Sequence, residues 1–249
     1  ASKKKFAASY GLTSAYWQHE SAAGSPEVLD YLKGNLEDLA NHYHALYQNT
    51  DRPEDKPAHF TESALWYRTF LTSFPAEVET PGIHYQLADL LLQNEDFSSA
   101  ANEYEHIAYD YPAHDRAAAA GYAAIFSHRQ YEKQVTEPDL ESARRESVAS
   151  TIRFVDGFPL HEHSPAVLGA AVDDLYGLND FAGAIAVGHR LLEQFPTAAE
   201  EIRRGAWTAI AHSSLDTNDF VVAENAYAQV IKLTPPEDPS AEKIMNNLA

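Results

Sequence analysis

The sequence contains no cysteine in its 249 residues. Without a thiol the chain forms no disulfide, offers no thiolate nucleophile and binds no zinc through cysteine. Its glycines fall into none of the phosphate-binding loops, serine nucleophile turns or dinucleotide-binding motifs that mark common enzyme families. These absences remove several classes of catalytic site.

Basic residues are scarce: lysine and arginine total 18 against 37 acidic residues, a formal net charge of −19. An acidic surface repels phosphate groups, so we expect neither nucleic acid nor an anionic lipid surface as a partner. No apolar run approaches the roughly 20 residues that a membrane-spanning helix needs, and we identify no signal peptide. We expect no direct membrane insertion and a protein or peptide partner.

Three segments share one spacing: an aromatic residue, an alanine three residues later and a proline fifteen residues later. A short polar turn precedes each aromatic residue, and a helical pattern of apolar residues precedes each turn. The spacing predicts an internal repeat whose unit is a pair of helices. The marker residues are Phe97, Ala100 and Pro112; Phe181, Ala184 and Pro196; and Phe220, Ala223 and Pro235.

The same pattern predicts the helices along the whole chain. We expect helix pairs at 26–48 and 60–74, 83–93 and 97–111, 116–133 and 138–155, 165–177 and 181–195, and 204–216 and 220–234, with a last helix at 240–249. A polar, proline-rich loop is expected at 49–59, an enlarged hairpin at 114–159, and a frayed end at Lys3–Lys5. No change in composition divides the chain, so we expect one domain over 1–249. Because the last helix has no partner, we expect a fragment of a longer protein or a bare terminal cap.

The last complete pair carries the fullest set of markers, and its residues occur in the order typical of tetratricopeptide repeats. These residues are Trp207, Ile210, Ala211, Phe220, Ala223, Tyr227 and Pro235. The matching positions of the other two pairs depart from the pattern at His84, Leu168 and Gly188. The chain therefore resembles the tetratricopeptide repeat family. The resemblance implies an all-α fold, a right-handed superhelix (α-solenoid) of about five helix pairs, which acts as a protein-binding scaffold and not as an enzyme.

Aromatic–proline pairs close successive repeats at Phe74-Pro75, Tyr111-Pro112, Phe158-Pro159 and Phe195-Pro196. This style of repeat resembles a bacterial cell-envelope subgroup that includes outer-membrane assembly lipoproteins and TolA-binding coordinators of cell division. The resemblance implies a periplasmic or outer-membrane-associated protein, with the cytoplasm as the alternative. Since the chain has no cysteine to carry a lipid, an anchor would lie outside it.

In tetratricopeptide proteins the first helix of each pair lines a concave groove that binds peptides or partner helices. Carrying the groove-facing positions onto this sequence gives the candidate partner-binding residues Tyr85, Asp89, Asp173, Tyr176, Thr208 and His212. Their aromatic and acidic character favours an extended or helical ligand with basic residues. The alternative is that they are ordinary solvent-facing residues.

We expect no catalytic residue, metal or cofactor. His42 and His44 are two apart on a predicted helix and point to different faces, and the pair His161 and His163 lacks a third ligand. The adjacent acids Asp173 and Asp174 also diverge on a helix.

Two alternative functions stay open. One is a substrate-recruiting or regulatory region of a larger enzyme or of a secretion or assembly complex. The other is a metal-dependent hydrolase that uses the histidines. The partner, the pathway and the oligomeric state are not readable from the sequence.

Overall fold

The computed structural model describes residues 2–19 and 24–235. Over these residues the chain forms eleven α-helices and no β-strand, so the prediction of an all-α fold is confirmed. The chain divides into two compact units, Ala1–Ser127 and His128–Ala249, which are described separately. The helix predicted at 240–249 lies outside the described residues.

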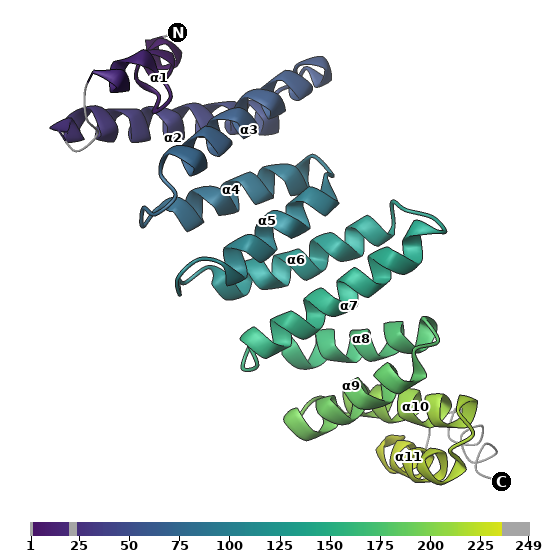
Figure 1. Ribbon diagram of the computed structural model, residues 1–249. Coiled ribbons are helices and arrows are strands. Elements are labelled where there is room, and N and C mark those ends of the chain that lie inside the picture. Colours follow the sequence, from purple (N-terminus) through teal and green to yellow (C-terminus); the bar gives the residue numbers. More distant parts are fainter. Residues whose placement is uncertain (1, 20–23, 236–249) are drawn as a thin grey trace. The chain divides into compact units, whose positions relative to one another are not determined.

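Unit 1 is a series of helices in which each, from α2 to α5, packs on the one before it (Figure 1). Its helices are α1 (Ser2–Tyr10), α2 (Pro26–Asn49), α3 (Lys56–Ser73), α4 (Thr80–Gln93), α5 (Phe97–Tyr109) and the first part of α6 (Ala117–Glu132), with short 3₁₀ turns at Ala15–Gln18 and Pro53–Asp55. Leu36, Tyr67, Phe70, Leu87 and Tyr104 fill the core between these helices and are almost completely buried. Burial of these apolar faces is what stabilises the stack.

Unit 2 consists of the rest of α6 and five more helices. They are α7 (Asp139–Gly157), α8 (Ser164–Gly177), α9 (Phe181–Gln194), α10 (Glu200–Asp216) and α11 (Phe220–Leu233). Consecutive helices pack from α7 to α11, and α10 also packs on α8. Phe154, Leu168, Leu191 and Ile210 are completely buried between them. Helices occupy the predicted positions, and four of the five predicted pairs pack together: α2 with α3, α4 with α5, α8 with α9, and α10 with α11. The superhelix into which they would wind stays a prediction.

One turn geometry joins the helices of three hairpins, α4–α5, α8–α9 and α10–α11. Its middle residue has the left-handed backbone conformation, and the aspartate after it accepts a hydrogen bond from an amide in the first turn of the next helix. The middle residues are Glu95 (φ 60°), Asn179 (φ 57°) and Asn218 (φ 62°), and the capping residues are Asp96, Asp180 and Asp219. The recurrence explains why three polar triplets precede the repeated phenylalanine.

Three of the four aromatic–proline pairs share one conformation; the fourth, Tyr111-Pro112, differs, because α5 ends earlier, at Tyr109. Phe74, Phe158 and Phe195 end α3, α7 and α9 with φ between −132° and −125° and ψ of 58° or 59°. The following proline has no amide hydrogen, so the helix cannot continue. Two buried hydroxyls secure the turn, since Thr80 donates to the Phe74 carbonyl oxygen (2.6 Å) and Ser164 to the Phe158 carbonyl oxygen (2.8 Å).

Two predictions about unit 1 are wrong. The expected loop at 49–59 is shorter, because α3 begins at Lys56 and takes Pro57 into its first turn, where a missing amide hydrogen costs nothing. The expected frayed end at Lys3–Lys5 is instead part of α1, and Lys3 and Lys4 form ion pairs with Asp38 and Glu62. Both errors come from reading proline or like charges as breaks in a helix.

Candidate functional site

The predicted residues Tyr85 and Asp89 lie one turn apart on α4 and share the same neighbours. The Tyr104 hydroxyl, which reaches over from α5, donates a hydrogen bond to the Asp89 carboxylate. The Tyr85 ring packs edge-on against Tyr104, with ring centres 5.2 Å apart, and the Arg116 guanidinium lies 5.4 Å from the centre of the Tyr85 ring. The structure therefore joins these two predicted residues in one aromatic and charged group.

Asp89 is a partly buried carboxylate without a cationic partner. Over the described residues of unit 1 it forms no ion pair, and its hydrogen bond comes from the neutral Tyr104 hydroxyl. Burial raises the pKa of Asp89 above its usual range, although the Tyr104 hydrogen bond and the charge of Arg116 oppose this shift. A partly desolvated carboxylate of this kind gains the most favourable interaction energy when a ligand brings a cation to it.

A second polar group links α2, α3 and α4 and is called here the α2–α4 polar cluster. It consists of Asn41, His44, Gln48, Tyr67 and Gln93. The Tyr67 hydroxyl donates to Asn41 Oδ1 (2.9 Å), and Gln48 Nε2 donates to Gln93 Oε1 (2.9 Å). His44 lies between these bonds, with Nδ1 3.0 Å from the Tyr67 hydroxyl and Nε2 3.1 Å from Gln48 Nε2.

The contacts of His44 suit a neutral ring. With Tyr67 donating to Asn41, the His44 Nδ1–H donates to the Tyr67 oxygen, and the bare His44 Nε2 accepts from Gln48. Burial lowers the pKa of His44, in agreement with a neutral ring. Gln93 Oε1 lies 3.4 Å from the same Nε2 and would accept from a protonated ring, so this contact opposes the effect of burial.

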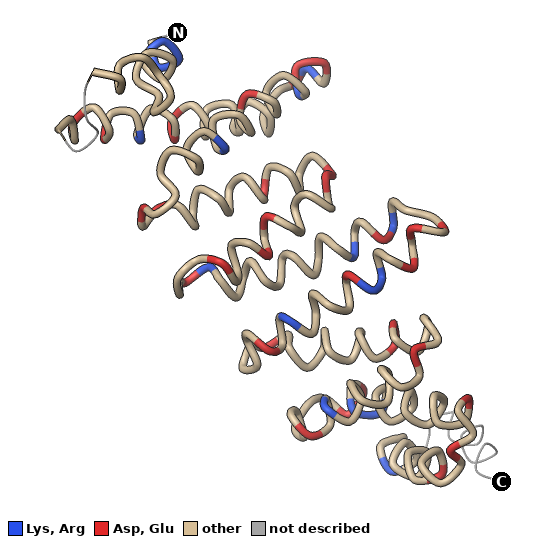
Figure 2. The backbone as a smooth tube through the Cα atoms, viewed as in Figure 1, with Lys and Arg blue, Asp and Glu red and all other residues tan. Residues whose placement is uncertain are grey.

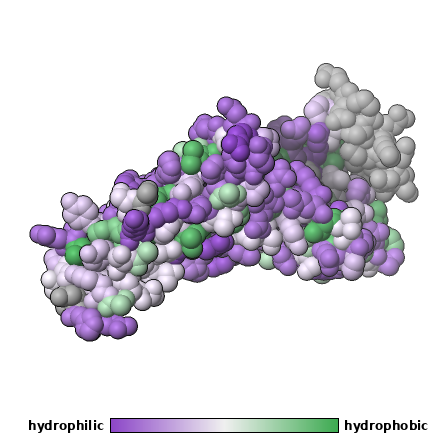
Figure 3. Space-filling model, turned by 90° about the horizontal axis from the view of Figure 1, so that it is seen from above, coloured by the Kyte–Doolittle hydropathy of each residue, from purple (hydrophilic) through white to green (hydrophobic). Residues whose placement is uncertain are grey.

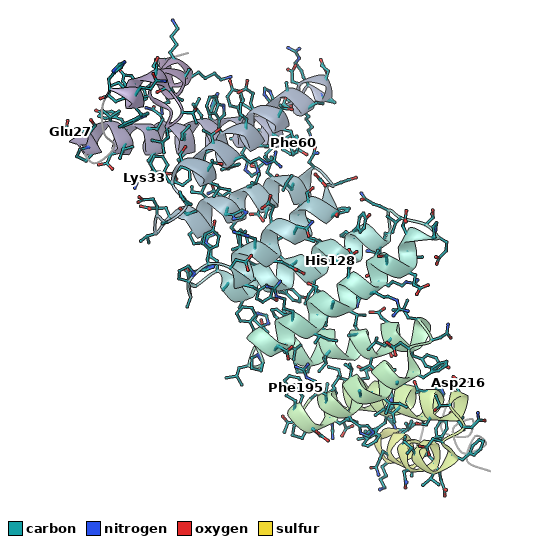
Figure 4. The ribbon with its side chains drawn as sticks, in the orientation of Figure 1. Glu27, Lys33, Phe60, His128, Phe195 and Asp216 are labelled. Carbon is teal, nitrogen blue, oxygen red and sulfur yellow. The ribbon has the colours of Figure 1, made fainter. Side chains whose placement is uncertain are left out.

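In unit 2 the predicted residues Tyr176 and His212 lie side by side, with ring centres 5.8 Å apart. The Tyr176 hydroxyl donates to the Asp216 carboxylate (3.1 Å), which is labelled in Figure 4 at the end of α10. The Tyr227 ring of α11 lies 5.8 Å from His212 on its other side. Three aromatic rings and one carboxylate thus form a second partly exposed group.

The two other predicted residues are placed differently. Thr208 donates its hydroxyl hydrogen to the carbonyl oxygen of Arg204 (2.9 Å), one turn earlier in α10. Its hydroxyl therefore has no hydrogen left to donate to a ligand. Asp173 is exposed, and desolvation together with repulsion from Asp174 raises its pKa. It is Asp174 that pairs with a cation, Arg129. The role of the six residues in binding stays a prediction.

The sequence reasoning missed the α2–α4 polar cluster and Arg116. It transferred groove positions only to the regular repeats, and α2 belongs to an irregular one. The spacing of the polar residues could have indicated the cluster. His44 and Gln48 are four apart on α2, and Asp89 and Gln93 are four apart on α4, so each pair shares a helix face.

Much of the molecular surface that the pictures show is polar. Figure 2 shows acidic residues spread over the helices and turns of both units, and the lysines of α1 gathered at its start. The face shown in Figure 3 is mostly hydrophilic, with small separate hydrophobic patches. Large exposed apolar side chains such as Val78 (94% exposed) and Leu160 (98%) stand in connections between helices. Recognition on this face would depend on hydrogen bonds and charge more than on a broad apolar patch.

A buried histidine fills the position where the repeat pattern has tryptophan in α10. His84 of α4 is 5% exposed, and its two nitrogens lie 2.6 Å from Glu103 Oε2 and 3.1 Å from the Tyr111 hydroxyl. The hydrogen bond from His84 holds the pKa of Glu103 below its usual range. His84 therefore replaces the packing of an indole by a satisfied polar contact between α4 and α5.

Nowhere in 2–19 and 24–235 do three His, Asp or Glu side chains come together in a way that could hold a metal ion. Every helix within those ranges is too short or too polar to cross a membrane.

Comparison with known proteins gives no relative. No protein-family model matches the chain, and no curated protein matches its sequence. The resemblance to tetratricopeptide repeats therefore depends on the repeat pattern of the chain itself.

Proposed function

We propose that this chain is a non-enzymatic scaffold that binds a peptide or protein segment carrying basic side chains. The observation that carries the proposal is Asp89: a partly buried carboxylate, held by Tyr104, next to the Tyr85 ring and without a cation of its own. A lysine or arginine of a ligand would supply the missing charge, and the Tyr85 ring would pack against its aliphatic part.

The α2–α4 polar cluster supports the same function. Its side chains hold one another through hydrogen bonds, so a ligand meets fixed donors and acceptors and loses less entropy on binding. The exposed amides of Gln48 and Gln93 on neighbouring helices suit the backbone of an extended peptide. Acidic residues around this face would speed the approach of a basic partner.

We also propose that the repeats are of the tetratricopeptide type and that the protein works in the bacterial cell envelope. The repeated left-handed turn before an aspartate cap and the repeated aromatic–proline closure support the first part. The second part is supported by the resemblance of the aromatic–proline spacing alone.

Selection from a random dodecapeptide library on the purified chain tests the function. We expect selected peptides to be enriched in lysine and arginine, and calorimetry to show a loss of about tenfold or more in affinity for Asp89→Asn and for Tyr85→Ala. The matched control is Asp51→Asn, which removes an exposed acid in the α2–α3 connection and should leave affinity unchanged. Peptides without basic residues, or equal affinity for the Asp89 variant, would contradict the proposal.

A further inference from the structure

Helix α1 places Lys4 against a group of side chains on α2 and α3. The Lys4 ammonium lies 4.6 Å from the centre of the Tyr43 ring, 6.0 Å from the centre of the Trp66 ring and 2.7 Å from Glu62 Oε2. Aromatic faces within about 6 Å attract a cation, and a carboxylate neutralises it. Tyr43, Glu62 and Trp66 are called here the lysine site.

The lysine site is held in place by α2 and α3 themselves. Trp66 Nε1 donates to Glu62 Oε2 (2.9 Å), which fixes the carboxylate beside the indole ring. The Tyr43 ring contacts the rings of His42 and His59, with ring centres 5.3 and 6.2 Å away. The site therefore keeps its shape without α1. The mutual hydrogen bond raises the pKa of Lys4 and lowers that of Glu62, as expected for a favourable pair.

Besides the Lys4 contacts, α1 is held on α2 by the Lys3–Asp38 ion pair and by the Phe6 ring, whose centre lies 6.3 Å from that of Tyr31. Ala7 is the buried residue of this nine-residue helix. A hollow of about 960 Å³ lies beside it, lined by Ala8 and Leu12 on one side and by Leu65 of α3 on the other. A helix this short is marginal on its own, and an exposed ion pair adds about 1 kcal/mol or less. Lys4 is thus a ligand that a competitor can displace.

We infer that the lysine site binds a lysine on a helical segment of a partner protein, and that Lys4 occupies it as a competitor from the same chain. Helix α1 shows what fits: a lysine followed one turn later by the small residue Ala7. The site is independent of the proposed function around Asp89, because Tyr43 and Asn41 are two residues apart on α2 and lie on different faces.

The indole N–H signal of Trp66 in a ¹⁵N NMR spectrum reports directly on the site, and Trp66→Phe assigns it among the three tryptophans. The probe is a peptide with the sequence of residues 2–12, SKKKFAASYGL, and a second peptide with Lys4→Gln. We expect the lysine peptide to shift the Trp66 signal of the Lys4→Gln protein. To reach half of the full Trp66 shift, the wild-type protein should need at least about five times more peptide than the Lys4→Gln protein, because its own Lys4 competes for the site.

The matched control is Lys5→Gln, which removes the same charge from an exposed position of α1 and should titrate like the wild type. Glu62→Gln, combined with Lys4→Gln, should abolish the shift. An unmoved Trp66 signal in the Lys4→Gln protein, or an equal response to the glutamine peptide, would overturn the proposal. So would a dimer mass in light scattering of the wild type that Lys4→Gln abolishes, because the occupant would then be α1 of a second copy.

Discussion

Ile210 of α10 packs directly against the backbone of Gly188 in α9. A β-carbon at position 188 would come within 2.9 Å of Ile210 Cγ1, closer than packed side chains allow. The equivalent position of the α10–α11 pair is the aromatic residue Tyr227, so at Gly188 the Ile210 side chain takes the space that an aromatic ring would need. Alanine is the better helix former, but the clash should dominate. We expect Gly188→Ala to destabilise the protein by about 1–3 kcal/mol in urea unfolding.

Gly34 provides the matched control for this substitution. It lies exposed in the middle of α2, with nothing within 4 Å of the place of a β-carbon. Gly34→Ala should therefore stabilise the protein by up to about 1 kcal/mol through helix propensity alone. If both variants were stabilised equally, the close contact between Gly188 and Ile210 would be wrong.

Glu95 holds a left-handed conformation that suits its residue type poorly. Asparagine occupies the same place in the two sibling turns, at Asn179 and Asn218. Asparagine tolerates positive φ better than glutamate does. We expect Glu95→Asn to stabilise the protein by about 0.5–1 kcal/mol, measured by thermal or urea unfolding. The reverse change, Asn179→Glu, should destabilise the protein by a similar amount. If the two substitutions changed the stability in the same direction, the shared turn geometry would be wrong.

The sequence predicted the helices and turns well because their determinants are local. Asp96, Asp180 and Asp219 cap helices within three residues of their own position, and the aromatic–proline pairs end helices within the same turn. These signals depend on neighbours in the chain, so a repeated spacing was enough to find them.

The polar groups were harder to predict because they join helices that are distant in sequence. His44 and Gln93 are 49 residues apart and meet only when α2 and α4 lie together around Tyr67. Lys4 likewise reaches Glu62 from α1, a helix that the repeat spacing does not predict. Helical periodicity tells which face a residue occupies but not which side chain of another helix it meets.

Stability should fall on mild acidification because of His44. Burial lowers its pKa in the folded protein below the unfolded value of about 6.5. The unfolded chain therefore takes up the proton first, and the contribution of neutral His44, complete above pH 6.5, is lost as the pH falls toward its folded pKa. We expect the free energy of unfolding of the wild type to drop more between pH 7.5 and 5.5 than that of His44→Gln. Parallel pH curves would contradict the neutral assignment.

The hydrogen bond between Tyr104 and Asp89 should stabilise the protein at neutral pH and lose its effect in acid. Tyr104→Phe keeps the ring in its buried place but leaves the Asp89 carboxylate without its donor, so we expect a loss of about 1.5–3 kcal/mol at pH 7. Since that bond opposes the raised pKa of Asp89, the variant should raise this pKa further. The difference from wild type should shrink as the pH falls through the folded pKa of Asp89, where the carboxyl is neutral in both proteins.

A double-mutant cycle separates this interaction from simple packing. Asp89→Asn removes the charge, so Tyr104→Phe added to it should cost clearly less than it does alone. The measurement is urea unfolding of the four proteins at pH 7, repeated at a pH where Asp89 is protonated. Equal costs of Tyr104→Phe in both backgrounds would mean that the hydroxyl contributes through another contact. A coupling that disappears with the charge would instead mean that the tyrosine holds the carboxylate in the position from which it would meet a basic ligand.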